Sequence, residues 1–271
     1  MAAFFDLPPD LAPLSGVIAR GLERVVDRFD EQLRSDLPPI ARLVRHVERY
    51  RGKMLRPTLV LVGGLAAHPR AAAAEPDAIL TDAHTTLGAV CEMVHMATLV
   101  HDDVLDEAET RRRGQTVNRL YGNEPAVMLG DYLIAASYRL CSSLPTPDAA
   151  RAVAEAAVVT ASGELLQLHH RDDLSLDEPT YFEIVRRKTG VLIATSCRLG
   201  GWASGAAEPA LRALETFGTE TGIAFQIQDD VLDLTGSEST VGKSVGKDLE
   251  KGKLTLPLLM HLARAQGADR A

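Results

Sequence analysis

The pentad DDVLD occurs twice in this chain, at positions 102–106 and 229–233. Each copy follows an apolar segment with helical spacing, and the first and last aspartates of a copy are four residues apart, so both carboxylates share one helical face. One acidic cluster alone is usually a solvated helix end. Two identical clusters, made of Asp102, Asp103 and Asp106 and of Asp229, Asp230 and Asp233, favour a cation-binding site.

Basic residues gather in four other segments: Lys53 and Arg56; Arg111, Arg112 and Arg113; Lys188; and the glycine-rich stretch with Lys243, Lys247, Lys251 and Lys253. Neighbouring arginines need anions, and their guanidinium groups suit phosphate oxygens. A lysine in an apolar segment is costly to bury without a partner, which favours a ligand-facing Lys188. Taken singly, each segment is also compatible with an ordinary basic surface or an ion-pair network.

The acidic and basic sets together predict a diphosphate site. Carboxylates repel phosphate, but Mg²⁺ binds both, so a cluster of Mg²⁺ between two facing helices would hold one or two diphosphates. The sequence contains neither a GxxxxGK[ST] motif nor a nucleophile with a positioned base. The chemistry that fits is departure of diphosphate to leave a carbocation, with cations stabilising the leaving group and an apolar cavity excluding water.

The elements that must position these residues are predicted to be helices. Alanine and leucine dominate the 271 residues, and β-branched alternation is scarce, which indicates one all-α domain. Apolar periodicity predicts helices over about 10–37, from 38, over 77–106, 124–140 and 148–170, from 179 through 186–190, and over 208–233 and 255–265. His95 lies two turns before Asp102 on the same face, where a histidine is more often a core residue than a ligand.

Composition limits the partners and the compartment. A net charge of -8 argues against nucleic acid as a partner. Cys91, Cys141 and Cys197 stand singly, as reduced thiols in a cytosolic protein do. We find neither a signal-peptide pattern nor an apolar run long enough for a transmembrane segment, so we expect a cytoplasmic protein.

Seven motifs occur in a fixed order: GKMLRP, HDDVLDEAETRRRGQT, GNEPAVMLGDYL, GE at 163–164, KTG, FQIQDDVLD and GKSVGKDLEKGKLTLPLL. With them the chain resembles the trans-isoprenyl diphosphate synthases, or polyprenyl synthetases, from about 51 to 260. The resemblance implies a helical bundle of the isoprenoid synthase type around a deep central cavity, formed by a single domain over 1–271, and a homodimer. It implies a Mg²⁺-dependent prenyltransferase that condenses isopentenyl diphosphate with an allylic diphosphate such as farnesyl or geranylgeranyl diphosphate.

Roles follow from that resemblance by position in the motifs. Lys188 and the six aspartates form the catalytic set. Asp102, Asp106 and Asp229 would bind Mg²⁺, as about three ions once substrate is present, while Asp103, Asp230 and Asp233 support them or bridge through water. The residues implied to hold isopentenyl diphosphate are Lys53, Arg56, His95 and Arg112. Those implied to hold the allylic diphosphate are Arg111, Lys188, Thr189, Gln226, Lys243 and Lys253.

The chain departs from the family pattern in three places. Arg51 replaces the first glycine of a Gly-Gly-Lys motif, and Arg113 stands where a glycine follows the arginine pair. The chain also ends soon after the last motif, whereas the family continues through further helices. We therefore expect a synthase domain that lacks the usual C-terminal helices.

Small residues before the first pentad bear on product length. In the family, bulky aromatics at the positions of Ala97 and Thr98 form a floor that stops chain growth. Small residues there, with Val94 and Val90 deeper, predict a product longer than farnesyl diphosphate, with peripheral membrane contact for its release. Met93, Met96 and Met128 are the alternative candidates for a floor.

Two other functions stay open. A class I terpene cyclase also has an aspartate-rich helix, but it lines its cavity with aromatic residues, which make up only 4% of this chain. A non-catalytic or partner-dependent subunit of a heteromeric synthase usually loses aspartates or basic ligands, whereas both pentads are intact here.

Overall fold

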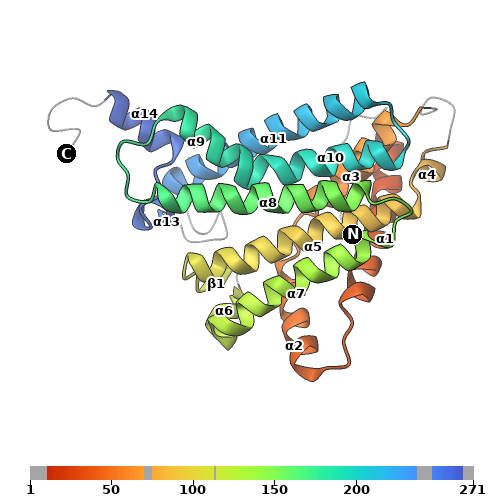
Figure 1. Cartoon of the computed structure of the whole chain (residues 1–271), viewed down its shortest axis with the longest axis horizontal. Coiled ribbons are helices and arrows are strands. Elements are labelled where there is room, and N and C mark those ends of the chain that lie inside the picture. The colour runs from red at the N-terminus through yellow and green to blue at the C-terminus, as the bar shows by residue number, and fades with distance from the viewer. Residues whose placement is uncertain (1–10, 70–74, 113, 237–245, 265–271) are drawn as a thin grey trace.

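The computed structural model describes residues 11–69, 75–112, 114–236 and 246–264, which form a bundle of α-helices (Figure 1). Several of its long helices run roughly along the long axis of the molecule. The helices are α1 (Ala12–Leu33), α2 (Pro38–Val47), α3 (Leu55–Ala67), α4 (Pro76–Ile79), α5 (Asp82–Leu105), α6 (Val117–Tyr121), α7 (Asn123–Cys141), α8 (Asp148–His169), α9 (Glu178–Val185), α10 (Val191–Ala203), α11 (Glu208–Thr235), α13 (Lys247–Glu250) and α14 (Leu256–Arg264). This architecture confirms the predicted all-α fold.

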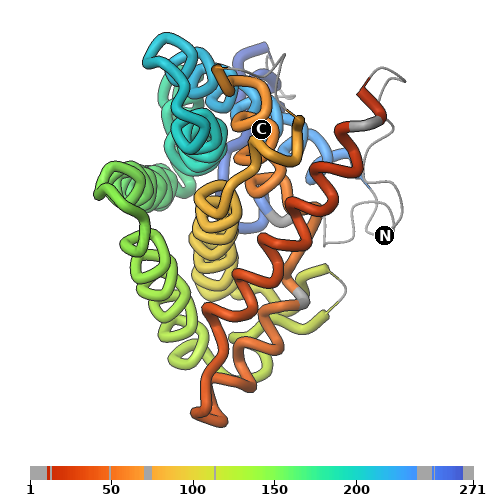
Figure 2. Tube along the Cα trace, turned by 90° about the vertical axis from the view of Figure 1, so that its right-hand side faces the viewer, coloured from red at the N-terminus to blue at the C-terminus, as the bar shows by residue number. Residues whose placement is uncertain are grey.

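Helix α5 lies at the centre of the bundle, packed against α1, α3, α7 and α10 (Figure 2). It is apolar on nearly every side, and Leu87, Val90, Met93 and Met96 are fully buried in the main core. The aspartates at its end are therefore carried on a rigid interior element, since close-packed cores resist displacement.

The start of α5 differs from the predicted 77–106 helix. The chain first makes the short helix α4 and then an extended link at Leu80 and Thr81. Thr81 caps α5 through a capping box, in which the Thr81 side chain accepts from the backbone of His84, and the His84 ring accepts from the Thr81 N–H over 3.1 Å. The prediction of one continuous helix over 77–106 was wrong, because the capping box makes α5 begin at Asp82.

The basic motif at 186–190 lies in a π-helical turn, η2 (Arg186–Gly190), between α9 and α10. The single helix predicted from 179 is therefore interrupted. Gly163 of α8 lies so close to this turn that a Cβ atom on Gly163 would be 2.6 Å from the backbone nitrogen of Lys188. The wide turn thus brings Lys188 and Thr189 close to α8, and π-turns are frequent at functional sites.

A two-stranded hairpin, β1 (Thr110–Arg111) paired with β2 (Gly114–Gln115), follows α5. It was not predicted, because two-residue strands give no periodic signal. Arg112 at its tip has φ 49°, a left-handed conformation that non-glycine residues seldom adopt. The hairpin therefore fixes the direction of the adjacent arginines.

Helix α1 ends at Leu33, earlier than the predicted 37, and Pro38 begins α2 as predicted. A second, smaller core contains Leu176, Tyr181, Ile184, Val185 and Ile223, and α14 packs against it through Leu256 and Leu259. This smaller core supports the second aspartate pentad.

Candidate functional site

The two pentads lie at the same end of the bundle, because α5 and α11 both finish there (Figure 1). Asp102 is in the last turn of α5 and Asp106 is its C-cap, while Asp229, Asp230 and Asp233 occupy the last two turns of α11. Neither helix has a basic residue in its last turn. A helix C-terminus is the negative end of the macrodipole, so carboxylates there need cations from elsewhere.

The segment 248–255 connects the two pentads. Lys253 Nζ lies 2.7 Å from Asp106 Oδ1. The backbone N–H of Lys253 donates to Asp248 O over 2.8 Å, and the Asp248 N–H donates to Asp233 Oδ2 over 3.2 Å. The predicted ligands of α5 and α11 are thus brought to one site by a third element.

Lys188 supplies a second cation to the same end of α5. Its Nζ donates to Gln167 Oε1 over 2.8 Å and forms an ion pair with Glu164. Burial alone would lower the pKa of Lys188, but the charges of Asp102, Glu164 and Asp106 outweigh it and raise the pKa above its usual value. Burial raises the pKa of Asp102, and Lys188 opposes that shift. Lys188 is therefore held as a cation between α5 and α8.

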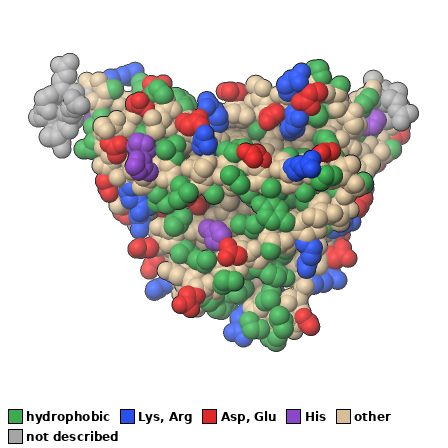
Figure 3. Space-filling model, in the orientation of Figure 1, with side chains coloured by type: hydrophobic (Ala, Val, Ile, Leu, Met, Phe, Trp, Pro, Cys, Tyr) green, Lys and Arg blue, Asp and Glu red, His purple; other side chains and the backbone are tan. Residues whose placement is uncertain are grey.

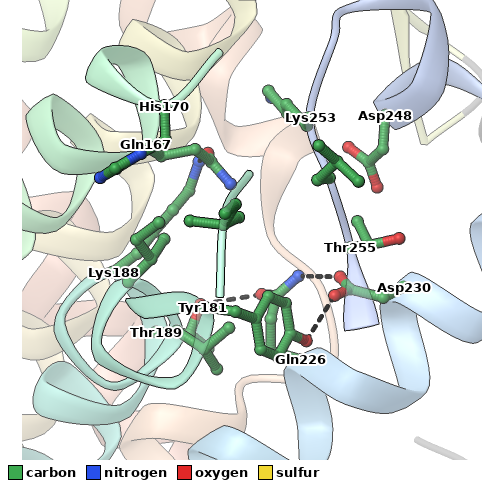
Figure 4. Close-up of a pocket in the computed structure, with 14 residues that line it drawn as sticks. Gln167, His170, Tyr181, Lys188, Thr189, Gln226, Asp230, Asp248, Lys253 and Thr255 are labelled. Atoms are coloured by element: carbon green, nitrogen blue, oxygen red, sulfur yellow. Dashed lines mark hydrogen bonds between the residues drawn. The ribbon is translucent and has the colours of Figure 1, made fainter. Parts of the chain in front are cut away.

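A chain of hydrogen bonds surrounds Asp230 (Figure 4). Thr189 Oγ1 donates to Gln226 Oε1 over 2.8 Å, and Gln226 Nε2 donates to Asp230 Oδ1 over 2.9 Å. The Tyr181 hydroxyl donates to Asp230 Oδ2 over 2.6 Å. These residues line a pocket together with Lys188, Lys253 and Asp248. Predicted ligands from η2, α11 and the C-terminal segment thus converge on one pocket.

Asp103 is not among the residues that line this pocket and is only 1% exposed. Its Oδ1 accepts from Arg111 Nε at 2.8 Å and lies 2.7 Å from Arg111 Nη2. The guanidinium also lies 6.0 Å from the ring centre of Tyr50. Burial would lower the pKa of Arg111, but the bond to Asp103 and its charge raise it. Asp103 therefore anchors Arg111 and the hairpin, rather than facing the pocket with Asp230.

Three of the four residues predicted to hold isopentenyl diphosphate, Arg56, His95 and Arg112, lie close to one another near the first pentad. Arg112 donates to the Tyr50 carbonyl, and its guanidinium lies so close to Gly52 that a Cβ there would overlap it. Arg56 has a buried Nε with no hydrogen-bond partner. Burial and the charges of Arg56, Arg112 and Arg111 lower the pKa of His95 well below its usual value, so this histidine is neutral at pH 7. A cationic group with an unsatisfied buried donor is suited to an anion.

Glu92, 2% exposed on α5, is the counter-charge that sequence reasoning missed. Burial raises its pKa, while Arg56, Arg112 and Arg51 oppose that shift. Its position one helical turn before His95 was the available signal, because a carboxylate on an apolar helix needs a partner. Tyr181 was also missed, since it lies in a different helix from Asp230 and forty-nine residues away.

The donor set fits Mg²⁺. Among the described residues, no three carboxylate, histidine or cysteine side chains converge as a preformed metal site. Mg²⁺ usually takes only one or two protein carboxylates and fills its other positions with substrate phosphates and water. Carboxylates at two negative helix ends, beside lysines that would meet phosphate, match that requirement.

Other predicted residues are placed as follows. Lys53 is exposed at the start of α3, and Asp229 is half-buried on α11. Lys243 and Arg113 lie outside the described residues. Met128 is 64% exposed on α7, so it cannot form a cavity floor within this chain, while Met93 and Met96 are buried in the core. Within the described part of the chain, the helices are too short or too polar to span a membrane.

Comparison with known proteins agrees with this geometry. Residues 38–271 match the polyprenyl synthetase family. The chain is 36% identical to heptaprenyl diphosphate synthase component 2 of Geobacillus stearothermophilus, covering 93% of this chain and 76% of that protein. It is 34% identical to octaprenyl diphosphate synthase of Escherichia coli, with the same coverage of both chains.

A solved structure gives the same result. The decaprenyl diphosphate synthase of Rhodobacter capsulatus superposes with a TM-score of 0.84 at 35% identity, over 95% of this chain and 77% of that one. The chain thus spans about three quarters of these relatives. The predicted family and enzyme class, trans-prenyltransferase, are confirmed. This chain belongs to the polyprenyl synthetase family.

Proposed function

We propose that this chain is a Mg²⁺-dependent trans-prenyltransferase that adds isopentenyl diphosphate head to tail onto an allylic diphosphate. The observation that carries the proposal is the meeting of two aspartate pentads with Lys188 and Lys253 at one end of the bundle. Opposite charges alternate there in the way that a diphosphate with its counter-ions requires.

The allylic side is formed by Lys188, Thr189, Gln226 and Lys253, which donate to the diphosphate. Their positive charge and hydroxyl and amide dipoles stabilise the charge that develops on the leaving group as its bond to carbon breaks. Mg²⁺ held by Asp102, Asp106 and Asp229 would supply further Lewis-acid stabilisation of that charge. The apolar face of α5 excludes water from the allylic cation.

The second substrate binds on the basic side. Arg56, Arg112 and Lys53 attract its diphosphate, and neutral His95 donates a hydrogen bond. The double bond of isopentenyl diphosphate attacks the cation, and the released diphosphate takes the proton that restores a double bond. No protein nucleophile or base is required.

We propose a product longer than farnesyl diphosphate. Thr98 lies one turn before Asp102 on the same half-buried face of α5, where it is the residue that a growing chain would meet first. Its side chain is small, and its hydroxyl is bonded to the His95 carbonyl of its own helix over 2.8 Å. The relatives compared with this chain are named as a component of a heptaprenyl diphosphate synthase and as octaprenyl and decaprenyl diphosphate synthases, which supports a long product.

We also propose that the protein acts in the cytoplasm as a homodimer. Val127 and Met128 on α7 and Val158 and Leu165 on α8 are exposed. Figure 3 shows hydrophobic side chains gathered over these helices. A partner-dependent activity is the second candidate, because the Geobacillus relative is named as one component of a synthase.

The test is elongation by the purified protein. Labelled isopentenyl diphosphate and farnesyl diphosphate are incubated with Mg²⁺, and the products are dephosphorylated and separated by chain length. We expect metal-dependent products longer than the primer, abolished by EDTA and reduced at least about a thousandfold in Asp102→Ala. A cyclic hydrocarbon formed from the primer alone would establish a cyclase, and no elongation by a folded protein would favour the partner-dependent reading.

Product length has its own test in Thr98→Phe. The larger ring should block the α5 face and shorten the main product by several isoprene units while the primer is still consumed. Leu174→Phe, at a 75% exposed position in the connection between α8 and α9, is the control and should leave the product unchanged. An unaltered distribution in Thr98→Phe would show that growth follows another face.

A further inference from the structure

Tyr181 is a buried phenol in the smaller core, 3% exposed on α9. No motif of the sequence includes it, and no substrate group was assigned to it above. Its hydroxyl donates to Asp230 Oδ2 over 2.6 Å, a length typical of a bond from a hydroxyl to a carboxylate. Burial, and then the bond to Asp230, raise the pKa of Tyr181, so its hydroxyl carries the proton needed for this bond.

The opposite oxygen of Asp230 accepts from the amide of Gln226. Asp230 is itself only 3% exposed, so its carboxylate is held from two sides inside the protein (Figure 4). Because Asp230 accepts from the amide nitrogen, Gln226 must present its oxygen on the other side, where Thr189 Oγ1 donates to it. Each bond in this row determines the orientation of the next group.

The row ends beside Lys188, which lines the same pocket. Thr189 follows Lys188 in the π-turn, so the orientation of Gln226 also restrains the turn that carries the lysine. A fixed carboxylate at position 230 would therefore order several diphosphate ligands at once.

We propose that Tyr181 is a positioning residue for the allylic diphosphate, acting through Asp230, Gln226 and Thr189. This inference rests on the proposed function, and it assigns Asp230 the work of orienting side chains rather than of binding metal directly. Removal of the hydroxyl would take away the hydrogen bond that Asp230 Oδ2 accepts and would weaken the restraint on this carboxylate. The side chains that bind the allylic diphosphate would be less well oriented. The site for isopentenyl diphosphate, around Arg56 and Arg112, would be unchanged.

The experiment uses Tyr181→Phe, which retains the ring and removes only the hydroxyl. Tyr138→Phe is the matched control, since Tyr138 is a half-buried phenol of α7 whose hydroxyl bonds to no described residue. In Mg²⁺ buffer, calorimetry measures binding of an allylic thiolodiphosphate, in which sulfur replaces the bridging oxygen and ionisation is slow. Steady-state assays give KM for each diphosphate.

We expect Tyr181→Phe to weaken binding of the allylic analogue about tenfold, as loss of one hydrogen bond to a charged group would. KM for the allylic substrate should rise similarly, and KM for isopentenyl diphosphate should stay within about twofold. A merely structural role would alter both substrates together, so equal losses would overturn the inference.

A double-mutant cycle tests the route through Asp230. On an Asp230→Asn background, Tyr181→Phe should cost less than about twofold in analogue binding, because the hydroxyl then has no carboxylate to orient. The full tenfold loss on that background would overturn the inference. If Tyr181→Phe binds the analogue as tightly as the wild type does, the inference about Tyr181 is overturned and the proposed function stands. If the wild type does not bind the analogue, both the inference and the proposed function are overturned.

Discussion

At the scale of single residues, the basic side of the site depends on a balance between Glu92 and the arginines around it. Burial lowers the pKa values of Arg56 and Arg112, and in both cases the charge of Glu92 opposes the shift. The arginines in turn oppose the rise in the pKa of Glu92. The basic side is therefore stabilised by a buried carboxylate, and a bound diphosphate would add further negative charge.

Glu92→Gln tests this balance. Loss of the carboxylate leaves buried cations without their counter-charge, so the free energy of unfolding should fall by about 3 kcal/mol in urea titrations. Pyrophosphate should restore part of that loss and should stabilise the variant more than the wild type. Glu155→Gln, at an exposed position on α8, is the control. Unchanged stability of Glu92→Gln would show that Glu92 does not balance the arginines.

At the scale of elements, the start of α5 is held by the ring of His84. Its Nδ1 accepts from the Thr81 N–H, and its Nε2 lies 3.0 Å from Ser204 Oγ at the end of α10. The Ser204 hydroxyl donates to the Gly64 carbonyl over 2.8 Å. Ser204 Oγ therefore accepts from His84, and the Nε2 atom of His84 must carry the ring proton. The neutral ring thus ties α5 to α3 and α10, and protonation of Nδ1 would break the cap.

The stability of the fold should therefore depend on pH. Burial lowers the pKa of His84 to about 4 in the folded protein, against about 6.5 when unfolded. Between these values the unfolded state binds the extra proton, so stability should fall as the pH drops from about 6.5 toward 4, by on the order of 3 kcal/mol. Chemical denaturation at a series of pH values between about 6.5 and 4 measures this change in the free energy of unfolding. Burial also lowers the pKa of His95, which contributes a pH dependence of the same sign, so His84→Gln should make the profile shallower without abolishing it, and exposed His169→Gln should leave it unchanged. An equally steep profile in His84→Gln would assign the effect elsewhere.

The helices and most of the site residues could be predicted from sequence, because both depend on the spacing of residues that are close together in the chain. The i, i+4 aspartates of α5 and the apolar faces of α1 and α7 needed no tertiary information. The π-turn η2 could not be predicted, because it depends on close contact with Gly163 of α8. The break before α5 depends on Ser204, and the orientation of Asp230 depends on Tyr181, which are distant in sequence.

At the scale of the whole molecule, the exposed apolar side chains of α7 and α8 bear on assembly. Met128, Val158 and Leu165 are 64%, 64% and 67% exposed. Apolar side chains concentrated on one face mark an interaction surface. Leu165 follows Glu164, the partner of Lys188, so a second copy docked on this face would lie beside the allylic side of the site.

Leu165→Glu should place a charge in that interface and shift the protein toward monomers, weakening self-association by at least about tenfold in sedimentation velocity. Leu174→Glu provides the matched control, because Leu174 is 75% exposed but lies in the connection between α8 and α9. A dimer that survives Leu165→Glu unchanged would place the interface on another face.

The π-turn also has a consequence for the gene. A π-turn holds one residue more than an α-helical turn, so losing a single codon within 186–190 would let the chain close into regular α-helix without a frameshift. Because the lost residue is the extra one that the wide turn held, the helical segments before and after the deletion would keep nearly the same rotation relative to each other. Such an allele would encode a well-formed helix that lacks the wide turn by which Lys188 and Thr189 approach Gly163 of α8. At this position the number of codons is therefore as informative as their identity.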